Sequence, residues 1–194
     1  MKIYGCMNLY GHNKELQQTL PALRRVADEV IIIEGPYRDF LYREKMTEDD
    51  FLFIHSLSDK IISKPEWESQ IEKRNTYLKL VPEGSYALIV DADEEIIGNL
   101  PELTEKAYRI SLYEKGVLKN NILRLVKKTK NLECHSCHNY FWDGEILLNQ
   151  QEWPVVENLV LKHIPISRKR RKFKEMYYKG LIKNEESSRK KYGI

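Results

Sequence analysis

Short apolar runs alternate with segments of helical spacing along the first hundred residues. The runs cover residues 2–8, 29–34, 60–63 and 85–90. They are too short for helices, and their apolar side chains are typical of buried strands. Leucines at helical spacing predict a helix from Asn13 onward, where Pro21 predicts a kink or a restart. A second helix is expected to open at Pro65 and to stop before Gly84.

This alternation predicts an α/β fold with a mostly parallel sheet and helices on both of its faces. Later in the chain we expect a helix from Pro101 to about Tyr113, a strand over residues 121–128 and a basic helix over residues 168–179. Ligands of such sheets bind at the carboxyl ends of the strands. Polar residues follow three of the predicted strands, so the sequence indicates a polar site at that edge.

The composition predicts a soluble protein of one domain over residues 1–194. No apolar run approaches the roughly 18 residues of a membrane span. The first residues lack the apolar stretch of a signal peptide. Three cysteines, an odd number, do not build a secreted disulfide framework. We therefore expect a cytoplasmic location.

Charge is distributed unevenly along the chain. Residues 162–194 hold 12 basic and 3 acidic side chains, while the whole chain has a net charge of +3. The preceding part is therefore acidic, and a basic tail of this kind indicates an anionic contact. Peripheral contact with a membrane surface is one interpretation. Nucleic acid is not expected, because few aromatic side chains are interleaved with the basic ones.

Two carboxylates follow the last of the apolar runs, in the order Asp91-Ala92-Asp93. Charged groups directly behind a buried strand are costly unless they are solvated or paired. Mg²⁺ and Mn²⁺ prefer oxygen ligands and bind through one or two carboxylates together with substrate phosphates. The pattern therefore predicts a cation and a diphosphate here. A solvated acidic turn that includes Glu94 and Glu95 remains the plain alternative.

In four places the chain resembles the GT-A glycosyltransferases, specifically the family 2-like group. The segments are residues 8–16 (NLYGHNKEL), 28–35 (DEVIIIEG), 72–75 (EKRN) and 87–96 (ALIVDADEEI). The match spans about residues 2–100 and keeps the order and spacing of the family. Glu34 stands where the family usually has Asp, and residues 36–39 also depart from its pattern. The short length is similar to that of minimal glycosyltransferases of archaeal viruses.

The resemblance implies that residues 1–100 bind a nucleotide-sugar and that residues 101–194 shape the acceptor side. Each implied role has a plain structural alternative, such as a strand-end turn or a surface charge. The implied nucleotide-sugar contacts are Tyr10 stacking on the base, Glu34 at the base or ribose, Arg74 at the diphosphate, and Asp91 and Asp93. The implied ligands of Mn²⁺ or Mg²⁺ are Asp93, Asp91 directly or through water, and His163, which follows a late apolar run.

An inverting transfer needs a base near the acceptor hydroxyl, whereas a retaining transfer needs none. Asp143 is the candidate base, because it lies beside Phe141 and Trp142, which could stack on a sugar. Glu145 and Glu152 are further candidates. An ordinary Asp-Gly turn at Asp143 explains the same residues equally well.

The sequence thus predicts a metal-dependent glycosyltransferase that moves a sugar from a nucleotide-sugar to a hydroxyl of a glycan, protein or lipid. One rival is a nucleotidyltransferase on a related fold, which should carry a glycine-rich basic loop after the first strand. Residues 11–14 (GHNK) are a poor version of that loop. A second rival is a non-catalytic binding module that uses the basic tail.

Overall fold

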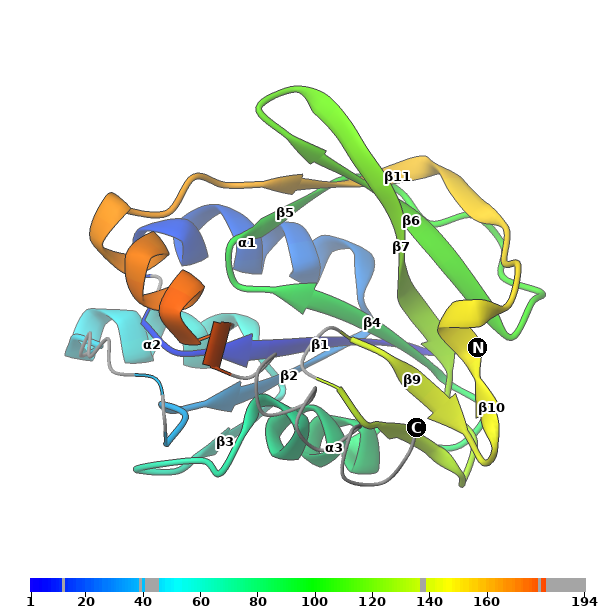
Figure 1. Ribbon diagram of the computed structural model, residues 1–194, viewed down its shortest axis with the longest axis horizontal. Coiled ribbons are helices and arrows are strands. Elements are labelled where there is room, and N and C mark those ends of the chain that lie inside the picture. Colours follow the sequence, from blue (N-terminus) through cyan, green and yellow to red (C-terminus); the bar gives the residue numbers. More distant parts are fainter. Residues whose placement is uncertain (12, 39, 41–45, 137–138, 178, 181–194) are drawn as a thin grey trace.

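An eight-stranded sheet runs through both halves of the chain in the order β3-β2-β1-β4-β7-β6-β11-β5 (Figure 1). The structure, a computed structural model, describes residues 1–11, 13–38, 40, 46–136, 139–177 and 179–180. The strands of the large sheet are β1 Ile3–Leu9, β2 Glu29–Glu34, β3 Lys60–Ser63, β4 Tyr86–Asp91, β5 Glu94–Gly98, β6 Ala107–Glu114, β7 Val117–Lys127 and β11 Val155–His163. A smaller sheet contains β8 Leu132–Cys134, β9 Phe141–Asp143 and β10 Ile146–Leu147, followed by the 3-10 turn η1 Leu148–Gln150.

The sheet is mixed, and this corrects the expectation of a mostly parallel one. Strands β1 to β4 are parallel to one another where they pair. Strand β7 runs antiparallel to both β4 and β6, and β11 is parallel to β6 but antiparallel to β5. The parallel pattern of the first hundred residues therefore does not continue, because β6 and β7 are joined by a hairpin instead of a helical crossover.

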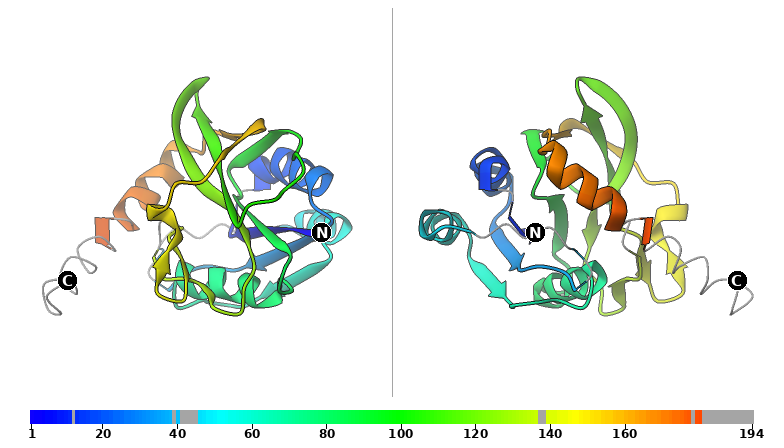
Figure 2. Two further views of the ribbon diagram at one scale, coloured as in Figure 1. Left: turned by 90° about the vertical axis from the view of Figure 1, so that its right-hand side faces the viewer. Right: turned by 60° about the vertical axis from the view of Figure 1, so that its left-hand side comes forward.

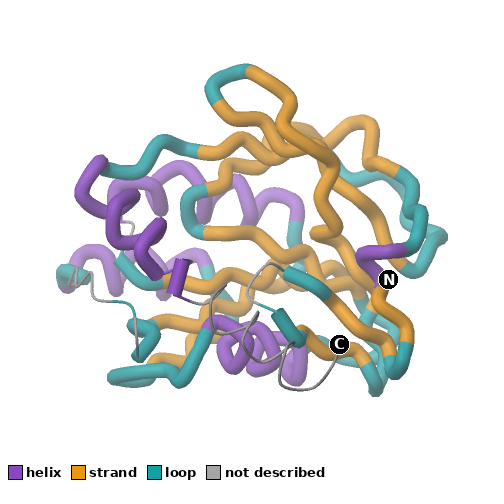
Figure 3. The backbone as a smooth tube through the Cα atoms, in the orientation of Figure 1, coloured by secondary structure: helices purple, strands orange, loops and turns teal. Residues whose placement is uncertain are grey.

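Helices cover both faces of the parallel part of the sheet, as predicted. They are α1 Asn13–Val26, α2 Glu48–Leu57 and α3 Gln70–Leu80. Figure 3 shows these helices gathered around β1 to β3, while the side of the molecule with β6 and β7 consists mainly of strands and loops, with the short helical turn η1 beside them. Leu16, Leu20 and Leu23 of α1 are buried in one apolar cluster with residues of β1, β2 and β4. The helical spacing of these leucines therefore marks the buried face of α1.

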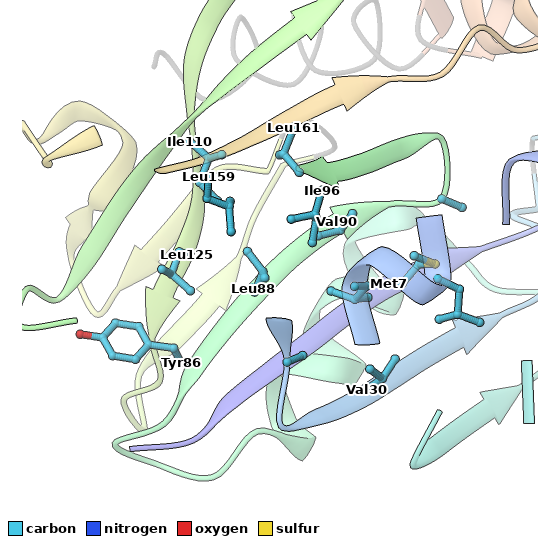
Figure 4. Packing of buried hydrophobic residues seen from close by; sticks show 14 of the residues in the cluster. Met7, Val30, Tyr86, Leu88, Val90, Ile96, Ile110, Leu125, Leu159 and Leu161 are labelled. Atoms are coloured by element: carbon cyan, nitrogen blue, oxygen red, sulfur yellow. The ribbon is translucent and has the colours of Figure 1, made fainter. Parts of the chain in front are cut away.

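The same cluster extends to the second half of the chain. Figure 4 shows Leu88 and Val90 of β4 packed among Ile96, Leu125 and Leu161, which come from β5, β7 and β11. Arg25 of α1 donates a hydrogen bond from Nη1 to the Gly98 oxygen at 2.9 Å, so α1 is also tied to β5. Both halves thus share one core on this face of the sheet.

The opposite face is covered by α3 and the small sheet. Tyr77 and Leu78 of α3 lie in a second buried cluster with Phe141. The Asn75 side chain pairs with the backbone of Cys134 on β8, accepting from its N–H at 2.7 Å and donating to its oxygen at 2.9 Å. The amide of Asn75 thereby fixes α3 against the small sheet.

The sequence predictions for individual elements have mixed outcomes. The four expected strands exist. Helix α1 continues through Pro21, so the restart that was one of the two expected effects of this proline does not occur. The second helix begins at Gln70, later than expected, where the Ser69 hydroxyl accepts a hydrogen bond from Glu72 N at 3.2 Å. A further helix, α2, was not predicted.

The expected helix from Pro101 to about Tyr113 is wrong, because residues 107–114 form strand β6. Its apolar residues Tyr108, Ile110 and Leu112 alternate with polar ones, which is the period of a strand. Lys115 and Gly116 then adopt positive φ angles of 52° and 78° and close a tight hairpin into β7.

Candidate functional site

The carboxyl ends of strands β1 and β4 lie side by side, and each of them carries a polar residue. Parallel pairing places Asn8 of β1 opposite Asp91, the last residue of β4. The chain then turns through Ala92 and Asp93 into β5, and Ala92 is buried in the core. The Asp93 backbone oxygen accepts a hydrogen bond from Ile164 N at 2.8 Å. The turn is therefore fixed between the core and the segment that follows β11.

The carboxylate of Asp93 is buried and meets two nitrogen groups from the end of the chain. Its side chain is 2% exposed, and Oδ2 lies 2.9 Å from Lys174 Nζ and 3.2 Å from His163 Nε2. The hydrogen bond to Asp93 raises the pKa of His163 above its usual value, although burial acts in the opposite direction. The site therefore concentrates opposite charges around a single carboxylate oxygen.

The Asp91 carboxylate is paired differently, with Arg124 of β7. Arg124 Nη2 donates to Asp91 Oδ2 at 2.8 Å and to Glu94 Oε1 at 2.6 Å. Burial is the largest single influence and opposes ionisation of Asp91, but the positive charges of Arg124, Arg74 and Lys174 together outweigh it and lower the pKa of Asp91. For Glu94 burial dominates and raises the pKa to about 7. One arginine thus holds two carboxylates together beside the Asp91–Asp93 turn.

The same arginine has donors that remain without partners. Arg124 is 4% exposed, and its Nε and Nη1 atoms have no hydrogen-bond partner within the described part of the chain. A buried donor left unsatisfied costs about 1–3 kcal/mol. A guanidinium held in this way is expected to bind further acceptor atoms.

A small cavity of about 50 Å³ lies at the ends of β1 and β4. Aromatic rings from Tyr10, Tyr37, Phe40 and Tyr177 line it, together with Asp91 and Asp93. Tyr177 stacks on Tyr37 with ring centroids 5.7 Å apart and an angle of 12° between the planes. Small-molecule sites usually measure about 300–1,000 Å³, so this cavity is too small for a nucleotide in the present conformation.

Helical residues 168–177 form one wall of the small cavity. The helix begins after Ser167, whose hydroxyl accepts a hydrogen bond from Arg170 N at 3.2 Å. Arg170, Lys174 and Tyr177 are spaced along one helical face and all line the cavity. Arg170 Nη2 donates a hydrogen bond to the backbone oxygen of Tyr10, and this bond connects the helix to the residue that follows β1. Figure 2 (right) brings this helix, drawn in orange, to the front, and in Figure 1 the arrowhead of β1 points toward it.

A larger cavity of about 510 Å³ lies on the other side of Asp91, which lines both cavities. Its charged wall contains Arg74, Arg109 and Arg124. The uncharged polar part contains Asn120, Asn121, Asn139, Tyr140 and Asn149. The two cavities therefore differ in size and in lining, and they share one carboxylate.

A buried lysine fixes the strand ends behind the small cavity. Lys73 of α3 is fully buried, and its Nζ donates to the backbone oxygens of Leu9 and Gly35 at 2.8 Å each. Burial lowers its pKa from 10.5 to about 7, although the charge of Glu34 acts in the opposite direction. The ammonium also lies 4.9 Å from the centre of the Tyr37 ring. Lys73 therefore joins the carboxyl ends of β1 and β2.

Most of the predicted site residues come together at this edge of the sheet. Tyr10, Asp91 and Asp93 line the small cavity, and Arg74 lines the larger one with Asp91. His163 reaches Asp93 from the end of β11. The grouping of these five residues agrees with the expected placement, while their individual roles stay predictions.

Two predicted residues lie elsewhere. Glu34 is buried and accepts a hydrogen bond from the Ser63 hydroxyl, and it is not part of either cavity wall described above. Asp143 lies on β9 in the small sheet, where its Oδ1 accepts from Thr129 Oγ1 at 2.6 Å. Asp143 is therefore not among the residues that line the two cavities beside Asp91, and its role as a base stays a prediction.

Sequence reasoning missed Arg124 and did not assign individual residues of the C-terminal helix. A charged residue between Leu123 and Leu125 in an apolar strand is a signal that could have indicated Arg124. For Lys174 and Tyr177 the signal was weaker, because a basic run is usually a solvated helical face.

The residues around Asp93 fit a divalent cation in part. Two ligand atoms about 2.1 Å from an octahedral ion lie about 3 Å apart, and Asp93 Oδ2 and His163 Nε2 are separated by 3.2 Å. Carboxylate oxygen and imidazole nitrogen suit Mn²⁺ better than Mg²⁺. However, Lys174 contacts the same oxygen, and in the described ranges no group of three or more His, Cys, Asp or Glu side chains is arranged to hold a metal. The fit is therefore limited to two ligands, with Lys174 displaced.

Comparison with known proteins found partial likenesses among solved structures. No family model and no curated protein matches the chain. S. aureus TarS 1-349 is 16% identical with a TM-score of 0.44, over 60% of this chain and 37% of that one. GalNAc-T7 with UDP, GalNAc and Mn²⁺ is 14% identical with a TM-score of 0.40, over 66% of this chain and 25% of that one. Likenesses this partial establish neither the fold nor the function of the chain.

None of the helices in the described part of the chain combines the length and the apolar character that are needed to cross a membrane.

Proposed function

We propose that this chain is a GT-A-type glycosyltransferase that binds a nucleotide-sugar at the Asp91–Asp93 turn. The proposal depends on one observation above all. Asp93 lies at the carboxyl ends of parallel strands, with its carboxylate 3.2 Å from His163 and with a cavity on either side of the turn. This is the edge at which α/β sheets bind ligands. The four sequence segments that resemble the family 2-like group support the same interpretation.

The nucleotide end of the donor is assigned to the small cavity. Its aromatic lining suits a base, and Tyr177 stacks on Tyr37 in the way that a base would stack on it. The donor diphosphate would then lie near Asp93, where Lys174 and Arg170 supply positive charge. Hydrogen bonding and charge at this position stabilise the leaving group when the sugar departs.

Asp93 and His163 are the residues that would hold a divalent cation. When bound, such an ion neutralises the charge of the departing diphosphate. Lys174 contacts the same Asp93 oxygen at 2.9 Å and must leave it first. The ammonium group of Lys174 would then be close enough to the turn to contact the diphosphate, so Lys174 would still contribute positive charge to donor binding.

The transfer forms a bond from the acceptor oxygen to the anomeric carbon and breaks the bond from that carbon to the diphosphate, and the proton of the acceptor hydroxyl passes to the departing diphosphate or to solvent. Asp91 lines both cavities, but its lowered pKa makes it a weak base. We therefore assign Asp91 to orientation of the donor and of Arg124. The stereochemistry is open in this proposal.

A calorimetric titration tests the proposal directly. UDP-, GDP- and dTDP-sugars are titrated into the full chain with and without Mn²⁺, and then into Asp93→Asn. We expect Mn²⁺-dependent binding of one nucleotide class that weakens about 100-fold in Asp93→Asn, because a charged ligand contact is lost. Glu102→Gln serves as a control, since it neutralises an exposed carboxylate outside the site.

Two outcomes would contradict the proposal. Absence of binding across the panel, with retained binding to anionic vesicles, would favour the non-catalytic module. Equal affinities of Asp93→Asn and the parent chain would remove Asp93 from the donor site. Thermal unfolding of each variant establishes that it is folded before the titration is interpreted.

A further inference from the structure

The larger cavity has the size and the lining of a second ligand site. Its volume of about 510 Å³ falls within the usual range for small-molecule sites. Asparagines from β7 and from the loops after β8 and β10 face it, and asparagine amides both donate to and accept from hydroxyl groups. Asn139 Oδ1 is buried without a hydrogen-bond partner among the described residues. This wall suits a polyhydroxylated ligand.

The positive charge of the cavity is fixed in place. Arg109 donates to the backbone oxygens of Asn121, Asn149 and Gln151 at 3.2, 2.8 and 3.2 Å, so its guanidinium is positioned without a carboxylate in these contacts. Arg74 lines the same wall. Two guanidinium groups, in addition to Arg124, therefore meet in one cavity to which Asp91 contributes a single carboxylate.

Arg124 provides an independent observation. It is 4% exposed, lines the cavity, and retains Nε and Nη1 without partners within the described residues. Its Nη2 is occupied by Asp91 and Glu94. The Nε–H and Nη1–H groups point to different sides of the guanidinium, so each can donate a separate charge-assisted hydrogen bond to an oxygen of a carboxylate or phosphate.

We propose that the larger cavity binds the acceptor and that the acceptor is a sugar bearing a carboxylate or phosphate group. The acceptor role depends on the proposed transferase function, whereas anion binding at this cavity does not. The anionic group would lie against Arg124 and Arg74, and the hydroxyl groups would lie along the asparagine wall. An acceptor placed here reaches Asp91, which also borders the donor side.

The experiment compares three probes on the full chain by ligand-detected NMR titration. These are glucuronic acid, glucose 6-phosphate and glucose. We expect the two anions to bind at least about tenfold more tightly than glucose, because charge-assisted hydrogen bonds are the stronger ones. Comparable affinities for all three would overturn the proposal.

Single-residue variants test whether the anionic group binds in the larger cavity. Asn120→Asp adds a negative charge to an exposed position of the cavity wall, so it should fold and reduce the anion preference severalfold. Asn158→Asp adds the same charge on exposed β11, outside the cavity wall, and should leave the preference unchanged. Arg124→Gln should abolish it, but this variant breaks the ion pair with Glu94 and is interpreted only if it folds.

Lys174→Met separates this cavity from the Asp93 side of the turn. The anion preference should survive in Lys174→Met, because Lys174 lines only the small cavity among the two described. A preference lost in Lys174→Met and retained in Asn120→Asp would place the anion at Asp93 and overturn the proposal. Selective anion binding without any nucleotide-sugar binding would overturn the acceptor role and leave the cavity as an anion site.

Discussion

A buried basic side chain lies near each of the two cavities beside Asp91, and the two side chains differ in whether their hydrogen-bond donors have partners. Behind the small cavity, Lys73 donates to two backbone oxygens at 2.8 Å. In the larger cavity, Arg124 binds two carboxylates through Nη2, while Nε and Nη1 have no partner in the described part of the chain. A satisfied buried donor supports structure, whereas an unsatisfied one is costly unless a ligand completes it.

The cavities also differ in volume. The small cavity, which is lined in part by helical residues 168–177, has about 50 Å³, whereas the larger one has about 510 Å³. A ligand that enters the small cavity must first displace Tyr177 from Tyr37. The proposed donor side therefore requires a conformational change, while the proposed acceptor side is already formed.

Lys73→Met tests the structural role of this satisfied buried donor, which is largely a neutral amine near pH 9, and has the largest expected effect. The variant removes the donor for two buried backbone oxygens, so we expect a loss of about 1–3 kcal/mol in the free energy of unfolding near pH 9. Chemical denaturation measures this loss. An unchanged free energy of unfolding at pH 9 would show that the hydrogen bonds of Lys73 do not stabilise the fold, and the proposed difference between Lys73 and Arg124 would be wrong.

The loss of stability in Lys73→Met should be larger at high pH than at low pH. The pKa of Lys73 is about 7 in the folded chain and 10.5 when unfolded, so between these values the unfolded chain binds more protons. Stability due to this group therefore rises with pH by about 1.4 kcal/mol per unit in that window and is constant below it. Lys73→Met lacks this slope, so its deficit should shrink as the pH falls from 9 to 6.

Tyr177→Ala tests closure of the small cavity. Removing the ring that stacks on Tyr37 lowers the cost of opening, so we expect association with the cognate nucleotide to become about fivefold faster. Stopped-flow tryptophan fluorescence measures the rate. Met176→Ala is a suitable control, because Met176 is exposed on the same helix. Slower association in Tyr177→Ala would show that the ring helps to recruit the nucleotide.

Asp143→Asn has the smallest expected effect. Its hydrogen bond to Thr129 contributes about 0.5–1.5 kcal/mol to stability, and we expect nucleotide and anion affinities to change less than about twofold. Sugar-transfer assays at matched donor occupancy provide the sharper measurement. A collapse of transfer with unchanged binding would return Asp143 to the role of base and would place a third element, β9, at the reaction centre.

The sequence predicted the parallel half of the sheet well because its signals are local. Continuous apolar strands such as residues 29–34 and 85–90 are buried on both faces, and the Asp91–Asp93 turn follows directly from the second of them. The meeting of Asp93 with His163 was anticipated only through the family resemblance. Their contact depends on β11 pairing with β5, and no local pattern in the sequence specifies that pairing.

The second half was predicted less well because its determinants are not local. The alternation in β6 is short and includes Arg109, whose partners are three backbone oxygens far along the chain. Arg124 depends on Asp91 and Glu94, about thirty residues earlier. Closure of the small cavity depends on Tyr177 reaching Tyr37, which only the complete fold determines.

The ion pair between Asp91 and Arg124 has a thermodynamic consequence for the order in which ligands bind. A molecule in one cavity that draws Asp91 away from Arg124 alters the charge presented to the other cavity. Linkage requires the effect to be reciprocal, so each ligand must change the affinity of the other by the same factor. One partly buried salt bridge, 2.8 Å long, therefore links the two occupancies and can make them cooperative or mutually exclusive, without any movement of the sheet.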